Sequence, residues 1–114
     1  MNDLQTPNES LYILASMYKE FLDRYNQGIP RGKAKFFGHQ SEILKIAPTI
    51  WEEDLPELLS ELRRKDLIIS PCGSNLHYYV KLSDQGIIYM ENKVGTDIKK
   101  LIKLISSLAS LLLK

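Results

Sequence analysis

The sequence is poor in the features that mark export, disulfide frameworks and membrane spans. It has one cysteine, so no internal disulfide can form. Its charge-free apolar run at 104–113 is about half the length that a membrane-spanning helix needs. No basic segment followed by an apolar run marks the N-terminal region. These absences predict a cytoplasmic protein that does not cross a membrane.

Recognised catalytic and ligand-binding motifs are also missing. There is no phosphate-binding glycine loop, dinucleotide fingerprint or serine elbow. His39, Cys72 and His77 lack the spacing of a metal site, and we interpret them as two surface histidines and a thiol in a turn. The acidic run at 52–54 is explained by the favourable effect of negative charge at the start of a helix. We therefore expect no enzyme activity, no cofactor and no metal.

The net charge is small, but the charges are unevenly distributed. Fifteen basic residues against fourteen acidic ones give +1 at pH 7, so the overall charge favours neither nucleic acid nor membrane as a partner. Basic residues gather in 28–45 and 93–114, whereas acids dominate 50–65 until its last three residues. Any electrostatic argument must therefore be local.

The first long segment has the pattern of an amphipathic helix over 7–26. Thr6 is placed to cap it, Pro7 suits its first position, Glu9 can complete a capping box, and Gly28 follows its end. Apolar residues recur at spacings of three and four, with a second ridge beside them. These are Leu11, Leu14, Tyr18, Phe21 and Tyr25, then Ile13 and Met17. So broad a stripe predicts more than one packing surface.

Two shorter helices are expected after a loop at 29–40, whose residues 34–37 have the composition of a short strand. Ser41 is expected to cap a helix that ends before Pro48. Asp54 is expected to cap a helix over 55–65, with Glu57 as the acid of its capping box. The buried side of that helix is predicted to be Leu55, Leu58, Leu59 and Leu62.

A hairpin is expected next, with strands at 67–70 and 76–82 and a turn at 71–75. Apolar and polar residues alternate along the return strand, which is typical of a strand with one face on a core. The pattern places Leu76, Tyr78, Val80 and Leu82 on the core and His77, Tyr79 and Lys81 in water. Ser83 is predicted to cap a helix over 83–93.

The segment Leu82-Ser83-Asp84-Gln85-Gly86 resembles the Leu-Thr-x-x-Gly signature of MarR-like and PadR-like bacterial regulators, with serine for threonine. Lys65-Asp66-Leu67-Ile68 is similar to the same superfamily's Leu-x-x-Gly-Leu-Ile pattern, with Asp66 in place of glycine. The resemblance covers roughly 41–92. It implies an α+β, mostly helical, winged helix-turn-helix domain at 1–95, with the helix-turn-helix at 41–65 and the wing at 67–82.

The remaining segment, 96–114, is predicted to be an apolar helix that Gly95 separates from its predecessor and Thr96 caps. The resemblance implies a homodimer that pairs through its first and last helices. The candidate dimerisation residues are Leu11, Leu14, Tyr18, Ile98, Leu101, Ile105, Leu108 and Leu112. A weaker alternative is interfacial membrane binding by this helix, supported by Lys99, Lys100 and Lys103.

The function that the resemblance implies is a homodimeric, DNA-binding regulator of transcription. Candidate contacts to duplex DNA are Arg31, Lys33, Lys35, Ser60, Arg63, Arg64, Lys65, His77 and Lys81. The expected recognition helix, however, exposes Glu53, Glu57 and Glu61, which phosphates repel. The alternative is therefore a winged-helix module that docks a protein through this acidic face and binds no DNA.

Overall fold

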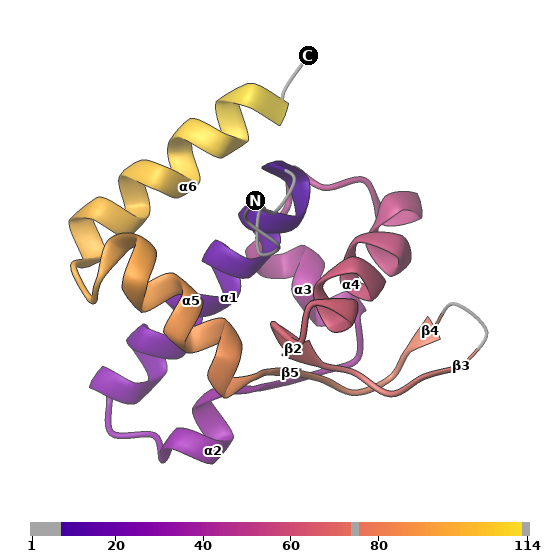
Figure 1. Ribbon diagram of the computed structural model, residues 1–114, viewed down its shortest axis with the longest axis horizontal. Coiled ribbons are helices and arrows are strands. Elements are labelled where there is room, and N and C mark those ends of the chain that lie inside the picture. The colour runs from indigo at the N-terminus through magenta and orange to yellow at the C-terminus, as the bar shows by residue number, and fades with distance from the viewer. Residues whose placement is uncertain (1–7, 74–75, 113–114) are drawn as a thin grey trace.

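The computed structural model describes residues 8–73 and 76–112 as an α+β fold, mostly helical, with a small antiparallel sheet (Figure 1). The helices are α1 (Asn8–Asn26), α2 (Arg31–Ala34), α3 (Ser41–Ile46), α4 (Leu55–Arg64), α5 (Asp84–Val94) and α6 (Ile98–Leu112), with a 3-10 turn, η1 (Glu52–Asp54). The strands are β1 (Phe36–Gly38), β2 (Ile68–Ile69), β3 (Cys72–Gly73), β4 (Leu76–His77) and β5 (Val80–Leu82).

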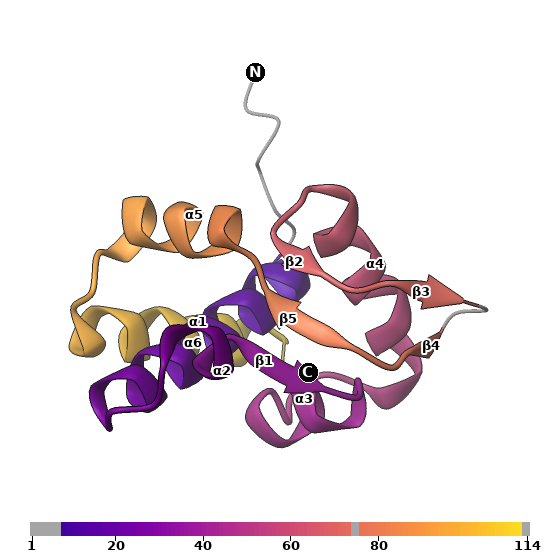
Figure 2. The same cartoon turned by 90° about the horizontal axis from the view of Figure 1, so that it is seen from below.

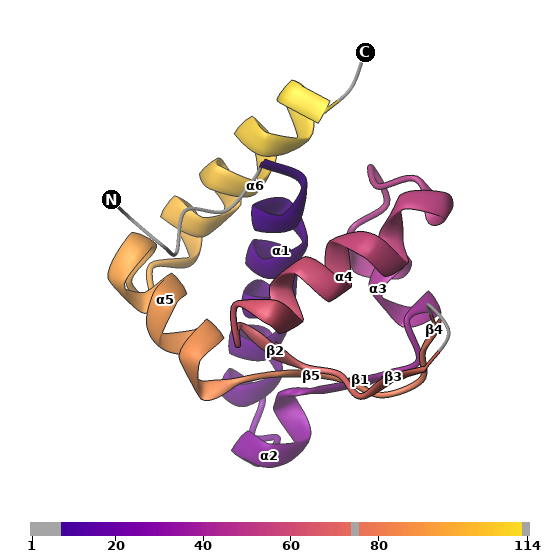
Figure 3. The ribbon, with the colours of Figure 1, turned by 45° about the vertical axis from the view of Figure 1, so that its right-hand side comes forward.

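Helix α1 is the centre of the molecule, and the other helices pack around it (Figure 3). Every residue from Ser10 to Tyr18 is buried, which confirms the broad apolar stripe, although Tyr25 near its end is 50% exposed. The chain leaves α1 through Gly28, whose φ of 94° favours glycine. The predicted cap and first helical residue, Thr6 and Pro7, lie outside the described residues.

The segment expected to be a loop contains the short helix α2, and the first strand begins later than predicted. Pro30 precedes α2 with extended backbone angles, and its carbonyl accepts a hydrogen bond from the Ala34 N–H at 2.9 Å. Ala34 is the last residue of α2, so it does not start the strand, and its side chain is buried. Strand β1 therefore occupies 36–38, not 34–37.

The two middle helices lie where they were expected, and Asp54 is at the predicted N-cap position of α4, but neither predicted side-chain cap forms. Ser41 lies inside α3, and Asp54 makes no side-chain capping bond to α4. The reason is that η1 runs directly into α4, so Asp54 has helical backbone angles and not the extended ones of an N-cap. The buried side of α4 is confirmed as Leu55, Leu58, Leu59 and Leu62.

The three-stranded sheet has the order β1-β5-β2, with both pairs antiparallel. Lys81 of the central strand is opposite Phe36 on one side and Ile69 on the other. Strands β3 and β4 form a separate two-stranded hairpin that extends beyond the three-stranded sheet (Figure 2).

The predicted return strand is interrupted at Tyr78 and Tyr79, which separate β4 from β5. This irregularity changes which side chains face inward, because side chains of a strand alternate only while the strand is continuous. His77 is fully buried and Tyr78 is 65% exposed, so their predicted positions were wrong. Val80 and Leu82 are buried as predicted.

Helix α5 begins as predicted, because the Ser83 hydroxyl accepts a hydrogen bond from the Gly86 N–H at 2.9 Å. The cap of α6 is Asp97 and not Thr96, since an Asp97 carboxylate oxygen accepts from the Lys99 N–H at 2.9 Å. Between the two helices Gly95 has a φ of 68°. The chain then returns along α1 (Figure 1).

Helix α6 covers α1 within one chain. Leu101 and Leu108 are buried, and Ile98, Ile105 and Leu112 are half-buried against the core. The stripes expected to form a dimer interface, including Leu11, Leu14 and Tyr18 of α1, are therefore largely covered without a second copy. The exposed residues of α6 are mostly polar: Lys99, Lys100, Lys103, Ser106, Ser107 and Ser110, with Ile102 and Leu111.

Candidate functional sites

Three predicted DNA contacts, Arg31, Lys35 and Lys81, influence the carboxylate of Asp84, and Lys35 bonds it directly. The Lys35 ammonium lies 2.9 Å from an Asp84 oxygen and keeps only 13% of its side chain exposed. The hydrogen bond and charge of Lys35 hold the pKa of Asp84 below its usual value, and Arg31 and Lys81 lower that pKa further. The pairing of β1 with β5 thus brings cations from distant segments near one acid. We call Arg31, Lys35 and Lys81, with Lys33 from the same short helix as Arg31, the cationic cluster.

Exposed aromatic rings adjoin the cationic cluster on the outer face of the sheet. Directly opposite residues of antiparallel strands project on the same face, so Phe36, Lys81 and Ile69 form a row. The Tyr79 ring centroid lies 4.9 Å from that of Phe36, and both residues are 43% exposed. Ile69 is 47% exposed. This face therefore combines positive charge with apolar and aromatic surface.

Arg24 joins this face to the central helix. Its guanidinium donates to the Phe36 carbonyl at 2.8 Å and lies 4.7 Å from the centroid of the Phe37 ring. Arg31 has a similar position over Phe21, at 5.5 Å. Arg31 and Lys33 are both exposed on α2. The start of β1 is thus held to α1, which gives the aromatic row a rigid base.

His77 and Ser60, two other predicted DNA contacts, are bonded to each other under α4. The His77 Nε2 atom lies 3.1 Å from the Ser60 hydroxyl and 3.1 Å from the Pro56 carbonyl, and Nδ1 bonds Ser70. Burial lowers the pKa of His77; the hydrogen bond to Pro56 opposes this shift, and the charge of Arg63 adds to it. The expected surface histidine therefore connects the hairpin to α4 and has no solvent-facing side chain.

The Ser60 and His77 pair is not arranged for nucleophilic catalysis. A carbonyl oxygen only accepts hydrogen bonds, so the Nε2 atom facing Pro56 must carry the proton. Nε2 then cannot take a proton from Ser60, as the base of a serine nucleophile would have to do. The pair is a structural link in this geometry.

The surface of α4 divides into an acidic start and a basic end. Glu53 and Glu57 are exposed, while Glu61 is half-buried and accepts from the Ser10 hydroxyl at 3.3 Å. A hollow of about 230 Å³ is lined here by Glu9, Glu53, Asp54, Glu57, Leu58 and Glu61. Arg63 and Arg64 are exposed at the other end, and Lys65 is half-buried. The half of α4 that would approach base edges is therefore negative.

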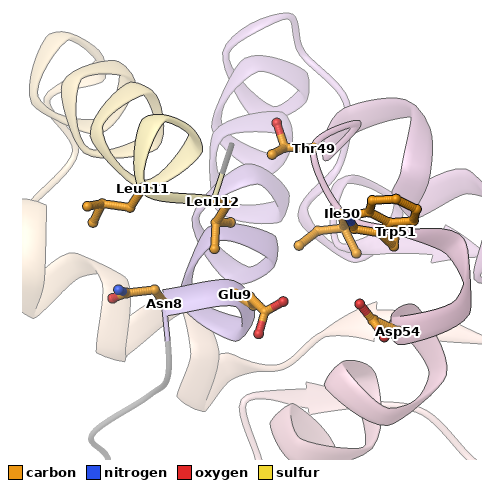
Figure 4. A pocket seen from close by; sticks show the side chains of 8 residues that line it. All are labelled: Asn8, Glu9, Thr49, Ile50, Trp51, Asp54, Leu111 and Leu112. Atoms are coloured by element: carbon orange, nitrogen blue, oxygen red, sulfur yellow. The ribbon is translucent and has the colours of Figure 1, made fainter. Parts of the chain in front are cut away.

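A larger groove lies beside this hollow, between the last turn of α6 and the segment before α4 (Figure 4). Its volume is about 640 Å³, and it is lined by Asn8, Glu9, Thr49, Ile50, Trp51, Asp54, Leu111 and Leu112. Trp51 is 71% exposed and Leu111 is 64% exposed. No sequence pattern predicted this site. A tryptophan directly before three acids was the available signal, but its exposure depends on how α6 folds back.

Comparison with known proteins gives no relative from which a role could be transferred. The chain matches no protein family, no curated protein and no solved structure. Within the described part of the chain, no helix has the length and apolar character to cross a membrane. Nor do three or more acids, histidines or cysteines of residues 8–73 and 76–112 come together as a metal site would require.

Proposed function

We propose that the chain is a winged-helix protein that binds nucleic acid through the cationic cluster and the adjoining aromatic row. The winged-helix assignment is supported by the strand order β1-β5-β2, with α3 and α4 between β1 and β2 in the chain. The hairpin from β2 to β5, which includes β3 and β4, corresponds to the wing. The Ser83 cap and Gly86 occupy the places that the superfamily signature gives them.

The observation that carries the nucleic-acid proposal is that the pairing of β1 with β5 brings Lys35, directly before β1, beside Lys81, while Arg31 lies on the helix that precedes β1. One acid, Asp84, leaves most of this positive charge uncompensated, and Lys33 adds to it nearby in the chain. Phosphate oxygens are the natural counter-charges for such a cluster, and binding them releases condensed cations from the nucleic acid. We therefore expect affinity that depends strongly on salt and weakly on sequence.

The aromatic row indicates which form of nucleic acid is favoured. The bases of a duplex are stacked on one another, whereas unpaired bases can stack on exposed protein rings. Phe36 and Tyr79 are half-exposed beside Lys81. We propose that single strands bind this face more tightly than duplexes do.

Helix α4 contributes little to the proposed binding of nucleic acid, although the resemblance implies that it is the recognition helix. Its acidic half would be repelled by phosphates. It also lies on the other side of β1 and β5 from α2 (Figures 1 and 3). Regulation of transcription by a homodimer, which the resemblance also implies, belongs to the proposal only if duplex DNA is bound.

The test is fluorescence anisotropy with one labelled DNA sequence, as single strand and as duplex, at about 50 and about 200 mM salt. The variant Arg31→Gln, Lys33→Gln, Lys81→Gln should weaken binding roughly tenfold or more and reduce the salt dependence. Lys35 is left in place because it is bonded to Asp84. A second variant, Phe36→Ser, should weaken the single strand more than the duplex.

The matched control is Lys99→Gln, Lys100→Gln, Lys103→Gln, which removes the same charge from the exposed side of α6. We expect this control to bind nearly as well as the unaltered protein. If both triple variants lose the same DNA affinity, only the net charge of the protein matters. That result would refute the assignment of DNA binding to the cationic cluster. Absence of binding to either DNA form at the lower salt would refute the proposed function itself.

A further inference from the structure

We propose that the groove between α6 and the segment before α4 is a docking site for a basic amphipathic helix of another protein. This proposal goes beyond the nucleic-acid function and concerns a different surface. The groove combines two exposed apolar side chains with carboxylates (Figure 4). Each of these features restricts the chemistry of the occupant.

Trp51 and Leu111 provide the apolar contacts. They come from opposite sides of the groove, Trp51 from the segment before α4 and Leu111 from the last turn of α6 (Figure 4). Both are more than half exposed, whereas Ile50, which also lines the groove, is buried. Tryptophan is among the residues that contribute most when an interface buries them, since its ring supplies a large apolar area. The occupant must therefore present apolar side chains.

The carboxylates select for positive charge. Glu9 and Asp54 line the groove, and Glu53, Glu57 and Glu61 continue the acidic surface into the adjacent hollow. None of these five forms an ion pair with another described residue, so no described cation neutralises them. Lysines or arginines flanking an apolar stripe would meet them, and like charges on a nucleic acid or an anionic lipid would be repelled.

A helix can present apolar and positively charged side chains on adjoining sides, as this groove requires. In an amphipathic helix, apolar residues at spacings of three and four lie on one side and charges flank them. Such a helix can lay its apolar side into a hydrophobic groove. Here the apolar side would cover Trp51 and Leu111, and the flanking cations would reach Glu9 and Asp54.

Trp51 is also the only tryptophan in the sequence, so its fluorescence reports on the groove. The probe is a labelled peptide of roughly 14 leucines and lysines with the leucines at helical spacing. The same peptide with glutamate for lysine is its counterpart. We expect the basic peptide to raise the anisotropy saturably and to shift Trp51 emission to shorter wavelength, and the acidic peptide to do neither.

Substitutions in the groove test where the peptide binds. Glu9→Gln with Asp54→Asn should weaken the basic peptide about tenfold, because two facing charges are lost. Asp54 makes no capping bond, so this change removes no hydrogen bond from α4. Leu111→Ser should weaken binding with the charges intact. The matched control, Glu91→Gln with Asp23→Asn, removes two acids outside the groove and should leave the affinity within twofold.

Several results would overturn the proposal. If the control pair weakens binding as much as the groove pair, attraction is by net charge alone. If Trp51 emission does not change on binding, the peptide sits elsewhere. If light scattering shows a dimer of the chain that Leu111→Ser dissociates, the groove holds a second copy and not a foreign helix. Melting temperatures of all variants confirm that each remains folded.

Discussion

The Nε2 atom of His77 lies 3.1 Å from the carbonyl oxygen of Pro56, and through this contact the β3–β4 hairpin is tied to the first turn of α4. The backbone of His77 adds to the link. Its carbonyl accepts from the Gln40 N–H at 2.8 Å, and its N–H donates to the Gln40 side chain at 2.9 Å. One residue thus holds the hairpin, α4 and the start of α3 together.

This arrangement predicts a loss of stability in mild acid. Burial keeps the pKa of His77 in the folded chain below its unfolded value, which is about 6.5. The unfolded chain therefore binds the proton more readily, so the stabilisation is complete above that unfolded pKa and declines as the pH falls through it. Chemical denaturation from about pH 8 to about pH 5 should show a falling free energy of unfolding.

Substitution identifies the group responsible. His77→Gln should reduce stability by about 1–3 kcal/mol at pH 8, because buried hydrogen bonds are lost, and should flatten the decline between pH 7 and 5. His39→Gln is the control, since His39 is exposed and bonded to Ser41. An unchanged pH profile in His77→Gln would show that another group titrates.

Gly86 is required because α5 packs closely on the backbone of Leu67, directly before β2. A Cβ atom at this position would overlap the carbonyl oxygen of Leu67 and crowd a methyl group of Leu82. Because a backbone oxygen cannot move aside as a side chain can, Gly86→Ala should cost about 3 kcal/mol or more in unfolding free energy. Gly32→Ala is the control, as a Cβ there meets nothing within 4 Å. Equal stability of the two variants would contradict the prediction.

Asp66 occupies a left-handed backbone position, with a φ of 60°. Its carbonyl accepts a 2.6 Å hydrogen bond from Ser83, a bond that glycine would keep. Asp66→Gly should therefore raise stability by about 0.5–1 kcal/mol, since the left-handed region is strained for residues with a Cβ. Asp66→Val should lower stability, because β-branched residues tolerate this region least. The free energy of unfolding should be highest with glycine, intermediate with aspartate and lowest with valine. Any other order would count against strain at this turn.

Tyr18 fastens the middle of α1 to the turn between α5 and α6. Its hydroxyl donates to the Gly95 carbonyl at 2.8 Å. Tyr18→Phe should cost about 1 kcal/mol, measured by denaturant unfolding near pH 7. Burial, and then the charge of Glu91, raises the pKa of Tyr18, so its contribution is lost as the pH rises above about 10. Tyr25→Phe, at a half-exposed ring, should have little effect.

The parts of the fold that could be predicted depend on local repetition. The spacing of apolar residues located α1, α4 and α6, and the signature after the hairpin located the Ser83 cap. The burial of His77 could not be predicted, because it follows from an irregularity of the strand that leaves no trace in an alternating pattern. The choice between Thr96 and Asp97 as the cap of α6 could not be predicted either, since both residue types are common N-caps.

The candidate sites depend still more on distant contacts. Arg31, Lys35 and Lys81 were chosen for their charge, and only the pairing of β1 with β5 shows that they share one surface. The groove at Trp51 requires α6 to return to the start of α1, which no local pattern indicates. What these surfaces bind remains a prediction for the experiments above.

The packing of α6 on α1 has a consequence for how the chain is made. During translation α1 leaves the ribosome long before α6, so the most deeply buried helix is made before one of the main elements that cover it. Until then its unprotected side is a target for chaperones and for aggregation. A chain stalled near Gly95 should be insoluble or chaperone-bound, whereas addition of residues 96–112 should release it.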